Sequence, residues 1–283
     1  MEEVNQGPIG VFDSGYGGIS VLANLIEAMP KESFVYISDS INAPYGELES
    51  QEVLNHALNH MRILEKQSAK AVVIACNTAT SAAATALRAK YSFPIIGMEP
   101  AVKPAITKSS SGKILVAATG LTLKERKFAA LVKKMDLQHN IVTLPCHGLV
   151  EIIEEYGPES KEVTKKLDEL LAPLQPLNVD GVVLGCTHYV LIKNQWKAAL
   201  PEGTRIHDGN EGTVKQTMRM IMENTTITKA HSMGKVSLMD SSQDDERLEK
   251  SKQLLQNQLR INGIVSSDQL EIELRKNNEL CKS

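Results

Sequence analysis

The chain has 283 residues, of which 42% are hydrophobic and 23% are charged, and its formal net charge is -3. This composition is typical of a soluble globular protein and excludes a disordered or fibrous one. Such a mild acidic balance gives no electrostatic reason to expect nucleic acid or an anionic membrane as a partner. The length is enough for about two average domains.

Short β-branched runs alternate with longer helical patterns through the first third of the chain. We expect strands over 9–12, 34–38, 71–76 and 94–98, and helices over 20–29, 51–66 and 80–91. Strands that are separated by roughly ten to fifteen helix-like residues favour βαβ units and a parallel sheet. The clearest helix is 51–66, where Val53, Leu58 and Met61 fall near one helical face.

The same rhythm restarts after the hydrophilic stretch 109–113. Residues 114–120 predict a new first strand, and residues 181–186 repeat the apolar strand that ends in a cysteine. Similar spacings separate Asp13 from Cys76 and Ala118 from Cys186. We therefore expect two similar α/β domains with mainly parallel sheets, related by a pseudo-twofold axis, with the active site in the cleft between them.

The expected first domain is discontinuous and comprises residues 1–98 and 210–283, and the second comprises residues 99–209. The stretch 240–260 is rich in polar and charged residues. It is predicted to be a solvated helix that leads into a polar tail, with little part in function. The acidic start of the chain does not resemble a secretory signal, no apolar run approaches the ~18 residues of a membrane span, and the four cysteines include no CxxC pair. We expect a cytoplasmic protein.

Cys76 and Cys186 each end an apolar strand, where ligands bind in open parallel sheets. A helix that opens just after each thiol would stabilise a thiolate and lower its pKa. The alternative for either residue is plain packing, because cysteine is among the most buried residue types. We expect packing for Cys146, and Cys281 to be incidental.

The segment 11–18 ends a strand with Asp13 and Ser14 and then has three glycines in four positions. Glycines let backbone amides approach an anion, and a carboxylate fits such a nest as well as a phosphate does. Neither GxGxxG nor a Walker lysine is present, which weakens the nucleotide interpretation. Asp13 itself would repel an anion, so we expect it to handle a proton or an ammonium group.

His188 follows Cys186 by two residues and is a candidate general acid or base, although a hydrogen-bonded loop histidine is the alternative. A zinc site formed by Cys76, Cys186 and His188 stays open, but the chain lacks the closely spaced ligand pairs of structural zinc sites. Asp39 precedes a Pro-Tyr-Gly turn that is ordinary by itself.

Taken together, the segments "GVFDSGYGGISVL", "PYG", "ACNTAT", "EPAVKPA" and "GCTHY" resemble the signature segments of the glutamate racemases, within the wider group of amino-acid racemases. The resemblance covers most of residues 8–212 in the family's order. It implies a two-base racemisation that needs no cofactor and no metal. The reaction would convert L-glutamate to D-glutamate for peptidoglycan, and the resemblance also implies a homodimer.

The resemblance assigns roles residue by residue. It makes Cys76 and Cys186 the two bases, with Asp13 assisting the first thiol and His188 the second. The residues that it places at the substrate site are Ser14, Asp39, Pro44, Tyr45, Gly46, Asn77, Thr78, Thr119, Thr122, Glu154 and Thr187.

Three positions depart from the family pattern. Val190 and Glu151 stand where proline is common, and His207 stands where aspartate is common. The family's aromatic tail motif is not recognisable. Three other functions remain open on the residues alone: an aspartate or other two-cysteine racemase, a module that binds an amino acid without chemistry, and a thiol-dependent hydrolase or acyl transferase with Cys186 as nucleophile.

Overall fold

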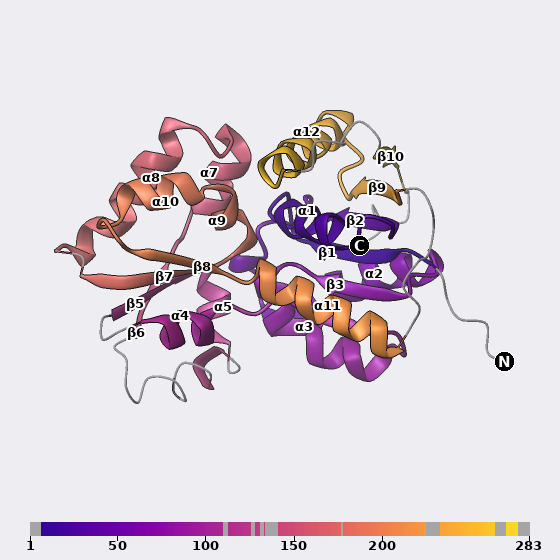
Figure 1. Cartoon of the computed structure of the whole chain (residues 1–283), viewed down its shortest axis with the longest axis horizontal. Coiled ribbons are helices and arrows are strands. Elements are labelled where there is room, and N and C mark those ends of the chain that lie inside the picture. Colours follow the sequence, from indigo (N-terminus) through magenta and orange to yellow (C-terminus); the bar gives the residue numbers. More distant parts are fainter. Residues whose placement is uncertain are drawn as a thin grey trace.

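The computed structural model describes residues 7–109, 113–125, 128–130, 133, 141–176, 178–224, 233–263 and 270–276. Two parallel sheets, each covered by helices, lie in two lobes side by side (Figure 1). We call the lobe of the six-stranded sheet the first lobe and that of the four-stranded sheet the second lobe. Cys281, which was expected to be incidental, lies outside the described residues.

The first lobe has the strand order β10-β9-β2-β1-β3-β4, with every described pairing parallel. Its strands are β1 (Ile9–Asp13), β2 (Phe34–Ser38), β3 (Ala71–Ile74), β4 (Ile95–Gly97), β9 (Lys235–Asp240) and β10 (Glu271–Arg275). Its helices are α1 (Ile19–Ala28), η1 (Tyr45–Glu47), α2 (Ser50–Lys66), α3 (Asn77–Lys90), α11 (Asn210–Asn224) and α12 (Asp245–Ile261).

The second lobe has the strand order β6-β5-β7-β8, again all parallel. Its strands are β5 (Lys113–Ala118), β6 (Ile141–Pro145), β7 (Val179–Gly185) and β8 (Arg205–Asp208). Its helices are α4 (Val102–Lys108), α5 (Gly120–Lys124), α7 (Leu149–Tyr156), α8 (Lys161–Leu171), η2 (Ala172–Leu174), α9 (Thr187–Leu191) and α10 (Lys193–Ala199).

The two sheets repeat one topology. The order β2-β1-β3-β4 in the first lobe corresponds strand for strand to β6-β5-β7-β8 in the second. Each lobe therefore places its first strand between its second and third, and this shared order agrees with the two related halves that the sequence repeat predicted. The expected fold class, two similar α/β units with parallel sheets, is confirmed.

Buried strands with apolar residues on both faces produce this layering. In β1, Val11 packs against one set of helices with Tyr36 and Val73, whereas its neighbour Phe12 packs on the opposite face with Ile37. Helices therefore cover both faces of the sheet, and the strand ends carry the loops that remain free for chemistry.

The helix predicted over 51–66 is α2, and the reason for its start is local. Glu49 caps it and forms a capping box with Glu52, whose carboxylate accepts the backbone N–H of Glu49 at 2.9 Å. Val53 and Met61 of its apolar stripe are fully buried in the core of the first lobe, whereas Leu58 is partly buried. This helix matches its prediction from periodicity.

The stretch 240–260 differs from its prediction. It begins at the end of β9, which pairs with β2, and it continues as α12, which packs against α1 with Leu248, Leu255 and Leu259 buried. The many charged residues lie on the other side of the helix and concealed its apolar stripe. The segment is an integral part of the first lobe, and the expectation of a solvated helix is wrong.

Among the described residues, no helix combines the length and the apolar character that a membrane crossing requires.

Candidate active site

Cys76 and Cys186 occupy equivalent places in the two lobes. Cys76 follows β3 and is the N-cap of α3, and Cys186 follows β7 and is the N-cap of α9. Both thiols are buried, with 5% and 8% of the respective residues exposed, and neither is in a disulfide. The duplicated topology thus presents one thiol from the carboxyl edge of each sheet.

The environment of Cys76 opposes the thiolate. Its sulfur lies 3.5 Å from Ser14 Oγ and accepts the backbone N–H of Ala79 at 3.4 Å, which is the contact expected at a helix start. Burial nevertheless raises the pKa of Cys76 to about 12, and the nearby Asp13 carboxylate adds to the rise. The amide of Ala79 at the helix start lowers the pKa of Cys76, as expected, but burial and Asp13 outweigh this contact and the net shift is upward.

Asp13 connects the two lobes. Its Oδ1 accepts the backbone N–H of Gly15 at 2.9 Å, and its Oδ2 accepts the hydroxyl of Thr187 at 3.0 Å. Burial raises the pKa of this carboxyl to about 6, although the positive His188 partly opposes the rise. Since Thr187 adjoins Cys186 and Ser14 contacts Cys76, a short run of contacts leads from one thiol to the other.

His188 stands between Cys186 and Glu154. Its Nδ1 lies 3.9 Å from the Cys186 sulfur, and its Nε2 lies 2.9 Å from Glu154 Oε1. Burial lowers the pKa of His188, but the contacts with Cys186 and Glu154 outweigh it and hold the pKa well above the ordinary value. The imidazolium is therefore available beside the second thiol, as a general acid or as the counter-charge of a thiolate.

The glycines of 11–18 let backbone and side chains of the second lobe approach closely. A Cβ on Gly15 would lie 2.0 Å from Glu154 Oε1, and one on Gly17 would lie 2.3 Å from Thr187 Oγ1. The backbone N–H of Tyr16 donates to Glu154 Oε1 at 3.4 Å. The carboxylates at this loop belong to the chain itself, and the glycines allow the second lobe to approach closely.

Three threonines bring both lobes together on the other side of Cys76. Thr78 lies 3.0 Å from Thr119 and 3.1 Å from Thr122, and the hydroxyls of Thr119 and Thr122 lie 2.9 Å apart. Gly46 packs on Thr119, where a Cβ would lie 2.7 Å from the threonine Cβ. These predicted residues therefore form one hydroxyl cluster.

Asp39 is buried, and protein groups contact both of its carboxylate oxygens. Its Oδ2 accepts the Tyr45 hydroxyl at 2.5 Å and lies 2.9 Å from His60 Nε2, and Asn42 donates to its Oδ1 at 3.0 Å. Burial opposes its charge, but the bonds from His60, Tyr45 and Asn42 lower its pKa to about 2. Asp39 thus holds the ring of Tyr45, the residue that follows Pro44 in the chain.

Asn77 has a free acceptor. Its side-chain amide contacts Met98 Sδ at 3.3 Å, while its buried Oδ1 has no hydrogen-bond partner in the described part of the chain. An unpartnered buried carbonyl is costly. It is therefore a natural place for a donor group of a ligand.

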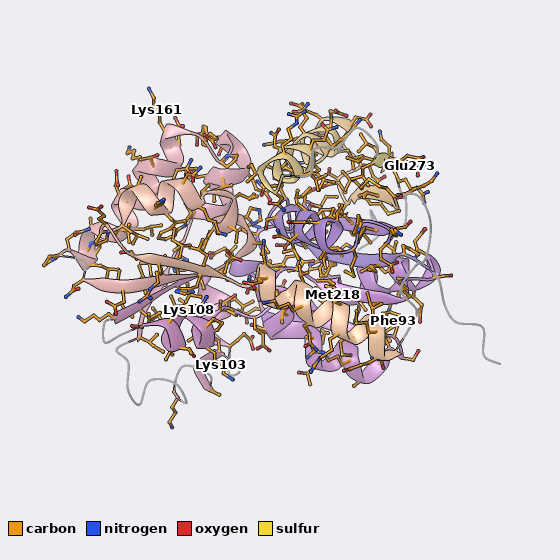
Figure 2. All side chains as sticks on the ribbon, viewed as in Figure 1. Phe93, Lys103, Lys108, Lys161, Met218 and Glu273 are labelled. Carbon is orange, nitrogen blue, oxygen red and sulfur yellow. The ribbon has the colours of Figure 1, made fainter. Side chains whose placement is uncertain are left out.

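A cavity of about 200 Å³ includes Pro44, Glu151, Glu154 and Arg247 in its lining. A larger groove of about 1460 Å³ lies elsewhere, where β4 and α11 of the first lobe meet β8 and α4 of the second. Figure 2 marks three residues that border it, Lys103 and Lys108 on α4 and Met218 on α11. None of the predicted site residues lines the groove.

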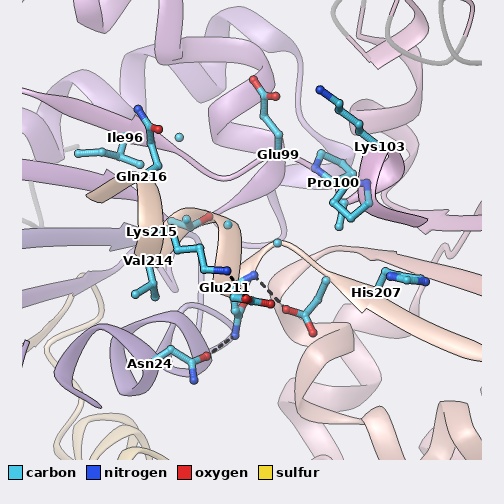
Figure 3. Close-up of a pocket in the computed structure, with 18 of the residues that line it drawn as sticks. Asn24, Ile96, Glu99, Pro100, Lys103, His207, Glu211, Val214, Lys215 and Gln216 are labelled. Atoms are coloured by element: carbon cyan, nitrogen blue, oxygen red, sulfur yellow. Dashed lines mark hydrogen bonds and ion pairs between the residues drawn. The ribbon is translucent and has the colours of Figure 1, made fainter. Parts of the chain in front are cut away.

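The three positions that depart from the family pattern lie in different surroundings. His207 lines the larger groove opposite Asn24 and Gln216 of the first lobe (Figure 3). Val190 packs among the apolar residues of the second lobe. Glu151, in contrast, lines the small cavity.

Several residues at the site were missed from the sequence. Tyr36 donates its hydroxyl to the Gly15 carbonyl at 2.5 Å, and His60 supports Asp39. Arg247 lies 3.5 Å from Glu154 Oε2. No local pattern marks these residues, because each reaches the site from a distant element whose apolar stripe carries the stronger signal. Cys146 packs in the core of the second lobe, as expected.

A thiol from each half of a duplicated parallel α/β fold, with carboxylate and imidazole groups beside the two thiols, is typical of two-lobed racemases. Within the described residues, no group of three or more His, Cys, Asp and Glu side chains is arranged to hold a metal ion.

Comparisons with known proteins identify the family. The model of the Asp/Glu/Hydantoin racemase family matches residues 22–217, and the chain belongs to this family. It is 43% identical over 257 residues to a glutamate racemase of Clostridium perfringens, covering 90% of this chain and 99% of that one.

Solved structures agree with this assignment. A glutamate racemase of Bacillus anthracis has a TM-score of 0.80 at 27% identity, covering 96% of this chain and 98% of that one. A glutamate racemase of Escherichia coli, solved with L-glutamate bound, also has a TM-score of 0.80 at 27% identity, covering 95% and 98%.

Proposed function

We propose that this protein interconverts L- and D-glutamate by proton transfer at the α-carbon, with Cys76 and Cys186 as the two acid/base groups. The observation that carries the proposal is the equivalent placement of the two buried thiols, one from each lobe, with Asp13 and Thr187 bonded between them. The glutamate racemases among its relatives support glutamate as the substrate.

The simplest way to racemise a substrate held in one position is with two groups on opposite faces of the stereocentre. One group removes the α-proton, and the other returns a proton to the opposite face. A duplicated fold supplies such a pair with similar chemistry on both sides. The two thiols must then start in opposite protonation states, and these states are exchanged in the reverse reaction.

The groups beside each thiol are suited to that exchange. Asp13, with a pKa of about 6, can hold or release a proton near neutral pH next to Cys76. The positive His188 stabilises a thiolate at Cys186. An ammonium group of the substrate would offset the Asp13 charge, which contributes to the high pKa of Cys76.

A thiolate is a far weaker base than the carbanion that it must generate, so position and electrostatics have to supply the difference. Holding the base at near-contact with the α-carbon recovers roughly 7 to 11 kcal/mol of barrier in the best intramolecular cases. Fixed donors such as the hydroxyls of Ser14 and Thr78 would stabilise the charge that flows into the substrate carboxylate. The burial of both thiols excludes water, which strengthens these terms.

The remaining predicted residues fall into two groups: those suited to contact the substrate and those that hold another residue in place. The free carbonyl of Asn77 is suited to the ammonium group, and Pro44, Tyr45 and Gly46 form the wall beside the threonines Thr119 and Thr122. Asp39 and Glu154 are proposed to act through others, since their carboxylates are bonded to Tyr45 and His188 respectively.

The wider setting is also a proposal. We propose that the domains comprise residues 1–98 with 210–283 and residues 99–209, which the strand membership of the two sheets supports. We propose a cytoplasmic protein, which three free cysteines support. The resemblance to glutamate racemases supports a homodimer and a role of the D-glutamate product in peptidoglycan.

Proton NMR in D₂O tests the reaction directly. The protein is incubated separately with L-glutamate, D-glutamate, L-aspartate and D-aspartate, and the α-proton signal and the optical rotation are followed. We expect deuterium at the α-position together with racemisation of both glutamate enantiomers, and much slower change of aspartate. Binding without loss of the α-proton would reduce the protein to a binding module, and faster exchange of aspartate would change the substrate.

A further inference from the structure

The C-terminal helix α12 reaches from the first lobe to the active site through two basic side chains. Arg247 Nη1 lies 3.5 Å from Glu154 Oε2, and Lys250 Nζ donates to the Glu154 backbone carbonyl at 2.7 Å. Glu154 belongs to α7 of the second lobe. Two cations of one lobe therefore hold a single acidic residue of the other lobe.

The carbonyl that Lys250 contacts has no partner within its own helix. The residue four positions after Glu154 is Pro158, which has no backbone N–H, so the α-helical bond to this carbonyl cannot form. Lys250 replaces the missing donor from α12. This contact fixes the backbone of α7 at the residue that bears the carboxylate.

Tyr16 completes the arrangement. Its ring lies 5.5 Å from the Arg247 guanidinium and 4.9 Å from Lys250 Nζ, which are cation–π distances, and its backbone N–H donates to Glu154 Oε1. The Arg247 side chain is 34% exposed and the Glu154 side chain 11%. The cations are thus ordered on one side by an aromatic face and on the other by Glu154.

The two oxygens of Glu154 have different partners. Oε2 faces Arg247, whereas Oε1 lies 2.9 Å from His188 Nε2, and Nδ1 of the same imidazole faces the Cys186 sulfur. We propose that Arg247 and Lys250 are positioning residues that hold Glu154 so that it orients His188 toward Cys186. This inference rests on the proposed function, because it assumes that Cys186 transfers a proton.

The charges around the imidazole support the direction of this effect. His188 faces Glu154 from α7, Asp13 from β1 and Cys186, and Glu154 faces Arg247 and Lys250 from α12. Burial raises the pKa of Glu154, but the contacts with His188 and Arg247 lower it below the ordinary value. Glu154 therefore remains ionised and acts as a fixed anchor for His188.

The test uses full-length Arg247→Ala, Arg247→Lys and Lys250→Met variants. Arg260→Ala is the matched control, since Arg260 is an exposed arginine in the last turn of the same helix. Free L- and D-glutamate have equal free energies, so any variant must lose kcat/KM equally in the two directions. A difference between the two proton transfers is therefore sought in the isotope effects. Each variant is assayed with both α-deuterated enantiomers.

We expect Arg247→Ala to lower kcat/KM by roughly 10- to 100-fold, because misplacement of a catalytic group has costs of this size. The primary isotope effect should rise for the enantiomer that Cys186 deprotonates, since that transfer becomes slower. Lys250→Met should lower kcat/KM and raise the same isotope effect by a smaller factor. Arg247→Lys should keep part of the activity that Arg247→Ala loses. Arg260→Ala should match the wild type in both measurements.

A wild-type rate and unchanged isotope effects in Arg247→Ala would overturn the positioning role. Equal losses in Arg247→Ala and Arg247→Lys with unchanged isotope effects would also overturn it and leave a purely structural contact. The Cys186→Ala variant separates this failure from failure of the proposed function, because it must be inactive if Cys186 is a base, whatever Arg247 does.

Discussion

Asp13 is a carboxylate whose burial opposes its charge. It is 0% exposed, and the two hydrogen bonds that it accepts from Gly15 and Thr187 do not offset the loss of water, so its pKa rises to about 6. A purely structural residue at this place would be better replaced by a neutral one. The cost is understandable if the carboxylate takes up and releases a proton beside Cys76.

Replacement of Asp13 by asparagine should stabilise the fold while removing activity. The folded-state pKa of about 6 exceeds the ordinary value of 3.8, so ionisation disfavours the folded state. This cost is absent below about pH 4 and complete above about pH 6. In urea unfolding, Asp13→Asn should gain about 3 kcal/mol over the wild type at pH 8 and almost nothing at pH 4. A variant that is less stable than the wild type at pH 8 would contradict this account of Asp13.

The candidate catalytic residues could be identified from the sequence, whereas the pKa of Cys76 could not be predicted from it. Cys76, Cys186 and Asp13 follow apolar strands, and this position alone marks them as candidates. The pKa of Cys76 depends on how deeply the lobes bury the thiol and how near Asp13 lies, and neither is visible in a local pattern. For this reason the helix-start argument described the Ala79 contact correctly but missed the net upward shift of the pKa.

Among the elements, α12 shows how charge can hide an apolar stripe. Its buried residues, Leu248, Ser251, Leu255 and Leu259, follow helical spacing, but charged and amide side chains separate them in the sequence. Strands such as β1 and β3 were predicted easily because they are apolar on both faces. The pairing of β9 with β2 joins residues just over two hundred positions apart, so no local signal could have revealed it.

A cavity in α12 tests whether the helix is integral to the fold. Leu255 is 0% exposed in the core of the first lobe, and truncation of such a leucine costs about 2 to 5 kcal/mol. Leu255→Ala should lose this amount in urea unfolding, whereas Gln253→Ala, on the exposed face of the same helix, should stay within about 0.5 kcal/mol of the wild type. Equal free energies of unfolding for the two variants would mean that α12 is a solvated helix that does not contribute to the core.

For the whole molecule, function depends on how closely the lobes approach. The loop after β1 meets the loop after β7 at Gly17, where a Cβ would lie 2.3 Å from Thr187 Oγ1 and 2.6 Å from the His188 backbone nitrogen. A backbone atom cannot move aside as the end of a flexible side chain can. A single methyl group at this position should therefore separate the two thiols.

The Gly17→Ala variant should lose at least about 100-fold in kcat/KM, because small displacements of reacting groups have large kinetic costs. Gly212→Ala is its control, since Gly212 lies in α11 with open space around its Cβ position, and alanine suits a helix. The circular dichroism spectrum and the unfolding curve of both variants should remain close to those of the wild type. Normal turnover in Gly17→Ala would show that close approach of the lobes at this point is not required.

The central claim is that both thiols transfer protons, and the racemisation rates of Cys76→Ala and Cys186→Ala in each direction test it most directly. Cys146→Ala serves as the control, because Cys146 is a buried thiol that packs in the core of the second lobe. The account predicts that each of the first two variants loses roughly 10,000-fold or more from both enantiomers, while Cys146→Ala remains active. Near-normal turnover in either Cys76→Ala or Cys186→Ala would contradict it.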